Sequence, residues 1–205
     1  FSRVDKNNYS KLGKCYNFLK GLVVGYISKN TSKKTYTILM NILFKEGNIS
    51  YSEGKYFKNL ENSKKIYFPN KRIDRVIINP AEHFDFLYET YCLENINFKE
   101  NDTIVDCGAN VGELFYSFEY KNLKIKYIGF EPDVYAYECL VQNLSNENAI
   151  LHNIALSNIS EESILYIDTE GANSSLIKFN TNAKQIPIKS KTLDSFNFKK
   201  IKLLK

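Results

Sequence analysis

Two carboxylates around a glycine turn form the pattern in this sequence that is best suited to chemistry. An apolar run over 103–107 carries Asp106 and is followed by Gly108 and Gly112, and a second apolar run ends at Glu131. Glycines permit a tight turn and a close approach of the backbone to a ligand. The next helix begins with amides that have no partner within it. A carboxylate such as Glu131 can accept two hydrogen bonds from a ribose diol, so the pattern predicts a nucleoside cofactor.

Two classes of cofactor compete for this turn. A dinucleotide fingerprint requires glycine at its first, third and sixth positions, the third so that the chain can approach a pyrophosphate. The window from Gly108 has Asn110 at the third position. S-adenosylmethionine has no phosphate, and its ammonium group suits a carboxylate such as Asp106. The residues therefore favour S-adenosylmethionine, while the spacing from the turn to Glu131 keeps an NAD-linked oxidoreductase as the alternative.

Six landmarks in order extend this pattern to the end of the chain. They are Val-Asp-Cys-Gly-Ala-Asn-Val-Gly at 105–112, Phe-Glu-Pro-Asp at 130–133, Asn143, Asn-Ile-Ala-Leu-Ser at 153–157, Ser-Ser-Leu at 174–176 and Thr-Leu-Asp at 192–194. In these segments the chain resembles the FkbM-type S-adenosylmethionine-dependent methyltransferases. The resemblance covers about residues 100–205, departs from the usual Val at Cys107, and includes nothing of the first 80 residues.

The resemblance implies a Rossmann-like O-methyltransferase that acts on a hydroxyl of a sugar, a glycan or a related metabolite. The cofactor-binding residues that it and the glycine turn predict are Asp106, Gly108, Ala109, Asn110, Gly112, Glu131, Pro132, Asp133, Asn153 and Ala155. The resemblance also implies that the loop with Ser174 and Ser175 lies on the substrate side of the site. The family typically continues beyond a strand like 201–205 with Ile-Asp and a Glu-Gly turn, so we expect a sheet truncated at its C-terminal end. No general base is assigned, because the first candidate for it would be a carboxylate of that Glu-Gly turn, which lies beyond Lys205.

These residues need a parallel sheet to position them. From residue 102 onward, expected strands at 103–107, 125–130 and 149–154 alternate with expected helices at 111–121 and 134–145. This order predicts an α/β fold with right-handed crossovers. Further strands are expected at 164–168, 185–189 and 200–205.

The first 80 residues predict a basic, helical N-terminal extension to a cofactor-binding domain at 81–205. They carry 16 Lys and Arg against 5 Asp and Glu, whereas the rest of the chain carries 12 against 18. Apolar periodicity predicts amphipathic helices at 9–28 and 33–44, with short strands at 65–68 and 76–78. The charge points to an anionic partner, and we expect a membrane surface or an acidic glycan rather than nucleic acid. A third hypothesis is thus a non-catalytic module that binds an acidic surface; a simply solvated basic face is the plainer interpretation.

A helix is expected from Asn79 to about Leu93, because Asn79 can cap it and Pro80 suits its first position. It carries His83, one of two histidines; neither this residue nor His152 lies in a catalytic pattern. The acids Asp85 and Glu89 lie one turn apart on the same helix, a spacing more typical of a solvated face than of a metal site. No residue set predicts metal ligands, and the sequence leaves metal dependence open.

Four scattered cysteines do not have the spacing of a zinc site or a disulfide framework. No apolar run approaches the roughly 20 residues that span a bilayer, and the opening residues lack the apolar core of a signal peptide. We therefore expect a protein of a reducing cytoplasm, either dissolved there or peripheral at the inner membrane surface.

Overall fold

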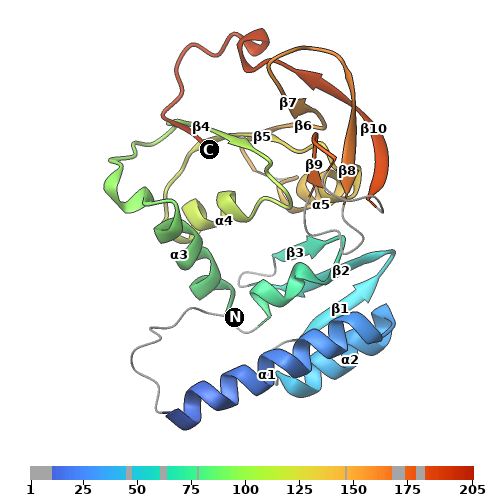
Figure 1. Ribbon diagram of the computed structural model, residues 1–205. Helices are drawn as coiled ribbons and strands as arrows, with labels where there is room; N and C mark the ends of the chain where they lie inside the picture. The colour runs from blue at the N-terminus through green and yellow to red at the C-terminus, as the bar shows by residue number, and fades with distance from the viewer. Residues whose placement is uncertain are drawn as a thin grey trace.

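The protein is a mixed α/β structure built on a parallel sheet (Figure 1). The computed structural model describes residues 11–44, 48–60, 64–77, 79–145, 147–167, 174–178 and 183–205, with side chains from residue 19 onward. The parallel sheet has the order β11-β4-β5-β6. Its strands are β4 (Thr103–Cys107), β5 (Lys126–Phe130), β6 (Ala149–His152) and β11 (Leu203–Leu204).

Two helices connect the central strands of this sheet. α4 (Glu113–Tyr120) follows β4 and α5 (Val134–Asn143) follows β5, so the predicted β-α-β-α-β order is confirmed. Ile104 and Val105 are both fully buried, as expected for a strand covered on both faces. The register places Asp106 opposite Gly129 and Cys107 opposite Phe130. The carboxyl ends of β4 and β5 therefore lie at the same edge, and the glycine turn and Glu131 leave the sheet together.

A second sheet, of order β7-β10-β8-β9, lies between β6 and β11 in the sequence. It consists of β7 (Ala155–Leu156), β8 (Glu162–Ile167), β9 (Ser174–Ser175) and β10 (Lys184–Lys191). The strand expected over 149–154 was too long, because β6 ends at His152. The Asn153 side chain donates to the carbonyls of Glu131 (2.8 Å) and Pro132 (3.2 Å) where the chain leaves the parallel sheet.

The N-terminal part contains two helices and an antiparallel meander. α1 (Lys11–Asn30) and α2 (Lys33–Leu43) lie side by side at the far end of the molecule from the parallel sheet (Figure 1). The predicted start of α1 at residue 9 lies outside the described residues. The meander consists of β1 (Ile49–Ser52), β2 (Lys55–Asn59) and β3 (Lys65–Phe68). No helix among the described residues has the length and apolar character needed to cross a bilayer.

One predicted strand in this region is wrong. Val76, expected to begin a strand over 76–78, is instead the last residue of η2 (Lys71–Val76), a 3₁₀ helix. Asn70 caps this helix by accepting from the Arg72 amide, and both Ile73 and Val76 are buried. A spacing of three residues brings two side chains onto the same face of a 3₁₀ helix, which explains the helical outcome.

α3 (Pro80–Thr90) begins as predicted but ends early. Asn79 accepts hydrogen bonds from the amides of Ala81 and Glu82, and Pro80 occupies the first helical position. The expected end at residue 93 is wrong, because Cys92 has a φ of 51°, in the left-handed region. A short 3₁₀ helix, η3 (Leu93–Asn95), follows.

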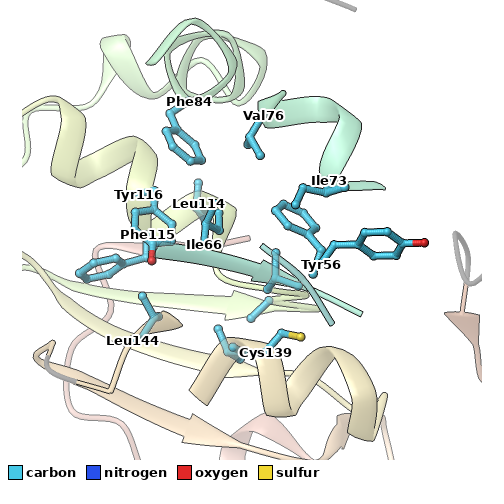
Figure 2. Packing of buried hydrophobic residues seen from close by; sticks show 14 of the residues in the cluster. Tyr56, Ile66, Ile73, Val76, Phe84, Leu114, Phe115, Tyr116, Cys139 and Leu144 are labelled. Carbon is cyan, nitrogen blue, oxygen red and sulfur yellow. The ribbon is translucent and has the colours of Figure 1, made fainter. Parts of the chain in front are cut away.

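One buried cluster joins the two halves of the chain (Figure 2). It includes Tyr36 of α2, Tyr56 of β2, Phe84 of α3, Tyr116 of α4 and Cys139 of α5. The meander packs on α5, and α3 packs on α4. Residues on both sides of position 80 therefore bury their apolar surface together, and the N-terminal elements pack against the helices that follow β4 and β5.

Asn143 fastens the meander to the glycine turn. Its Oδ1 accepts from the Tyr67 amide (2.8 Å), and its Nδ2 donates to the carbonyls of Tyr67 (3.1 Å) and Val111 (2.8 Å). Replacing Asn143 by Ala leaves these half-buried groups unpaired and should lower the free energy of unfolding by about 2 to 3 kcal/mol. Urea denaturation measures this, with exposed Gln142→Ala as a control expected to change it by less than about 0.5 kcal/mol. Equal stabilities of the two variants would contradict the bridging role.

Candidate cofactor site

The turn after β4 has an unusual backbone. Gly108 (φ 82°), Asn110 (φ 49°) and Gly112 (φ 90°) all lie in the left-handed region. Glycine reaches this region at no steric cost, and asparagine enters it more readily than most residues. The three positions fold the chain back over the end of the sheet before α4 begins.

The two glycines differ in the space around them. A Cβ at Gly112 would lie 3.1 Å from Leu140 Cδ1 and 3.3 Å from Leu144 Cδ1, whereas one at Gly108 would meet nothing within 4 Å. Both alanine variants incur the left-handed penalty of about 1 to 2 kcal/mol. Only Gly112→Ala also crowds α5, and we expect it to lose about 1 kcal/mol more in urea denaturation. A Gly108→Ala variant that is the less stable of the two would contradict this assignment.

The amides of the turn are already used within the protein. Those of Gly108 and Ala109 both donate to the Phe130 carbonyl, at 2.8 and 2.9 Å. The Asn110 amide donates to Oε2 of Glu131 at 2.7 Å. A pyrophosphate is normally bound by backbone amides of such a turn and of the helix that follows. The amides at these three positions of the turn are therefore not available for a phosphate.

Glu131 lies at the end of β5 with both carboxylate oxygens facing backbone amides. Oε1 accepts from the Asp133 amide at 2.9 Å, and Oε2 accepts from Asn110. The residue is 5% exposed, and burial raises the pKa of its carboxyl to about 7. Each oxygen can accept a further hydrogen bond. Asp133 caps α5 through the Tyr135 amide (2.9 Å), so Glu131 is not needed for that role.

Asp106 is buried beneath the turn and is paired with Lys205. The Lys205 Nζ lies 2.7 Å from one carboxylate oxygen, and the Tyr127 hydroxyl donates to the other. Burial raises the pKa of Asp106, and the Lys205 ammonium opposes that rise. The carboxylate that was predicted to face a cofactor ammonium thus faces the ammonium of Lys205, in the wall of the same hollow.

A hollow of about 320 Å³ collects these groups, within the range of small-molecule sites. Six predicted residues line it: Asp106, Gly108, Ala109, Asn110, Glu131 and Asp133. Ser174, expected near the substrate, also lines it. The other four predicted residues lie elsewhere: Gly112 packs against α5, Pro132 and Asn153 line a separate hollow beside β10, and Ala155 is buried in β7.

Another wall comes from η2 and α3, for which the sequence pattern predicted no role in the site. The lining residues of this wall come from two elements. They are Asn70, Arg72 and Arg75 from the η2 region, and Leu87 and Tyr91 from around the end of α3. No local pattern marks these residues. They reach the hollow because α3 packs on α4 and η2 packs on α3.

A buried charge cluster, missed in the sequence, lies in the lining of the same hollow. Glu113 accepts from Nε2 of His83 (2.8 Å), from Nη1 of Arg75 (3.2 Å) and from the side-chain amide of Asn110 (3.0 Å). Burial opposes ionisation of Glu113, but the His83 hydrogen bond and the Arg75 charge outweigh it and lower its pKa. Through these hydrogen bonds, Glu113 connects η2 and α3 to the glycine turn. Its one sequence signal was an acid directly after Gly112.

The remaining candidate residues have structural contacts. His152 stacks on Phe130 with ring centroids 4.8 Å apart, and Asp85 pairs with Lys121 at 3.0 Å. Within the part of the chain that the structure describes, no group of three or more His, Cys, Asp or Glu side chains is arranged to hold a metal ion.

Comparisons with known proteins return solved structures only. No family model and no curated protein matches the chain. The chain is similar to methyltransferase FkbM from Methylobacillus flagellatus KT, with 13% identity over 60% of this chain and 35% of that one and a TM-score of 0.34. It is also similar to Pyrococcus horikoshii TYW2, solved in complex with MeSAdo, with 16% identity over 62% of this chain and 54% of that one and a TM-score of 0.36. The chain thus spans about one third to one half of the length of these proteins.

Proposed function

We propose that the protein binds S-adenosylmethionine in the hollow beside the glycine turn and transfers its methyl group to a hydroxyl. The observation that carries this proposal is the state of the turn. Its first three amides are used by Phe130 and Glu131, so the turn does not offer these donors to a phosphate. The lining of the hollow combines carboxylates with Arg72, Arg75 and Lys205. A nucleoside without phosphates fits this turn, whereas NAD has to place a pyrophosphate against it.

The residues around the hollow fit the separate parts of this cofactor. Glu131 would accept from the ribose hydroxyls. Arg75, held by Glu113 through one guanidinium N–H, would direct its other donors to a carboxylate group. When bound, S-adenosylmethionine supplies an electrophilic methyl group on a sulfonium. The protein's part is to hold the acceptor oxygen in line and to exclude water.

For the acceptor we propose a sugar hydroxyl in a glycan or a related metabolite, from the resemblance of residues 100–205 to the FkbM-type enzymes. The hydroxyl has to lose its proton during transfer, which needs a general base. Ser174, at the edge of the hollow, would contact the acceptor rather than remove this proton, because an unassisted serine is a weak base. The division at residue 80 and the cytoplasmic location remain predictions.

Isothermal titration calorimetry with S-adenosylmethionine and with NAD tests the proposal. We expect saturable binding of S-adenosylmethionine and of S-adenosylhomocysteine, which shares its ribose but lacks the positive sulfur. NAD should show no saturation at the same concentrations. Saturable binding of NAD alone would contradict the proposal and favour the oxidoreductase.

A second candidate role, attachment to an acidic surface, is favoured by the exposed face of α1. Leu19, Leu22, Val23 and Tyr26 follow helical spacing and are 46 to 70% exposed. Neither α1 nor α2 contains an acidic residue. A basic helix with an exposed apolar face is typical of binding at an anionic membrane interface. Sedimentation with vesicles that contain phosphatidylglycerol tests this role at low salt, where the attraction is strongest; no binding there would contradict it.

A further inference from the structure

A second hollow, of about 720 Å³, lies beside the cofactor hollow. It is formed by the end of α1, the start of α2 and the η2 region. Asn70 and Arg72 line both hollows, so the two share a wall. A ligand held in the second hollow can therefore reach the edge of the first.

The wall of this second hollow is basic. Lys29, Lys33, Lys71 and Arg72 line it, and among the described lining residues Asp74 is the one acid. Lys71 is fixed in place, because its ammonium donates to the carbonyls of Ser28 and Thr31 at the end of α1. Two donors are used in these contacts, and an ammonium has three. The balance of charge favours an anion.

The start of α2 adds its helix terminus to the same wall. Ser32 caps α2 by accepting from the Thr35 amide, and both Ser32 and Lys33 line the hollow. α2 has 11 residues, and the first amides of a helix together with its dipole favour an anionic group.

A buried hydroxyl in the same wall lacks a partner in the described part of the chain. Tyr56 is 1% exposed and lines the hollow, and its hydroxyl has no hydrogen-bond partner among the residues that the structure describes. Figure 2 shows the hydroxyl pointing away from the buried cluster into which the ring packs. A buried hydroxyl left unpaired costs about 1 to 3 kcal/mol, and an acceptor oxygen on a ligand would offset this cost. This observation is independent of the charges and also points to a bound ligand rich in acceptors.

We propose that the second hollow binds a phosphate group of the hydroxyl-bearing acceptor, so that the acceptor is a phosphorylated small molecule. This inference rests on the proposed methyl transfer, because it assigns the neighbouring hollow to S-adenosylmethionine. Lys33, Lys71 and Arg72 neutralise the phosphate, the Tyr56 hydroxyl donates to it, and the acceptor's hydroxyl extends past Arg72 toward the cofactor hollow.

Equilibrium dialysis of the full chain with inorganic pyrophosphate tests the site. Lys33→Ala and Tyr56→Phe should each weaken pyrophosphate binding about tenfold, since each removes one hydrogen bond or ion pair to a charged ligand. Lys124→Ala, which removes an exposed lysine outside this hollow, is the control with the same change of charge and should leave the affinity unchanged. Tyr56→Phe removes a hydroxyl that is unpaired in the ligand-free protein, so it should retain the thermal stability of the unmodified chain.

Titration of S-adenosylmethionine into the same samples separates the two proposals. Pyrophosphate binding that weakens in both variants without competing with S-adenosylmethionine supports the inference. Absent binding, equal affinity in all variants or competition with S-adenosylmethionine overturns it. Pyrophosphate binding without any binding of S-adenosylmethionine sustains the anion site but contradicts the methyl transfer. If Lys33→Ala weakens binding to phosphatidylglycerol vesicles but leaves pyrophosphate binding unchanged, the lysines of this hollow bind a lipid surface and the inference is overturned.

Discussion

Replacing Glu131 by Ala should weaken S-adenosylmethionine binding by at least about 100-fold in calorimetry. Two hydrogen bonds from the ribose to a buried carboxylate would be lost, each contributing about 1.5 to 3 kcal/mol. The Asn110 and Asp133 amides would also lose their acceptor, which loosens the turn. Glu138→Ala removes an exposed carboxylate from the adjacent α5 and should leave the affinity unchanged. Unchanged affinity in a folded Glu131→Ala variant would contradict the ribose contact.

The raised pKa of the Glu131 carboxyl predicts how cofactor binding depends on pH. Burial raises its pKa from an ordinary 4.5 to about 7. The protonated form is thus favoured in the folded state; its contribution to stability is complete below about pH 4.5 and is lost as the pH rises through 7. Only the ionised form accepts from both ribose hydroxyls, so S-adenosylmethionine affinity should rise between pH 6 and 8. In Glu131→Gln the affinity should no longer rise over this pH range. An unchanged rise of affinity with pH would show that another group titrates.

Replacing Glu113 by Ala should lower the free energy of unfolding by about 3 kcal/mol, the largest effect on stability that we predict. The change removes a carboxylate that is 9% exposed and leaves His83 and the half-exposed Arg75 without their acceptor, and loss of a buried hydrogen-bonding partner is strongly destabilising. Urea denaturation at neutral pH measures the loss. Glu119→Ala on the same helix breaks a half-exposed pair with Lys64 and should cost less than about 1 kcal/mol. Equal effects of the two variants would contradict the role of Glu113 as a link.

The lowered pKa of Glu113 gives this prediction a pH dependence of the opposite sign to that of Glu131. Its contribution to stability is present above the pKa of the unfolded chain and is lost as the pH falls through the lower pKa of the folded protein. The difference in stability between the unmodified protein and Glu113→Gln should therefore shrink in acid. Urea titrations from pH 7 down to pH 3 measure this, and a constant difference would contradict an ionised Glu113.

The sequence by itself predicted the elements that depend on short-range physics. Hydrophobic runs placed β4, β5 and the two helices after them, and Asn79 with Pro80 placed the start of α3. Two predicted strands were wrong because other local interactions prevailed. The 3₁₀ helix η2, which Asn70 caps, extends to Val76, where a strand over 76–78 was expected. The strand expected to reach residue 154 ends earlier, because the chain leaves the parallel sheet at Asn153.

The turn itself was also readable, because glycine at two spaced positions and a carboxylate after the next strand are local signals. Only the tertiary structure decided what faces that turn. Lys205 lies 99 positions from Asp106, and Arg75 lies 38 from Glu113, yet both pairs are in contact. Such contacts depend on how helices and strands pack, and no periodicity in the chain records that packing. The sequence therefore determined the glycine-turn side of the candidate site, whereas the wall that carries Arg72 and Arg75 followed from α3 and η2 packing against the core.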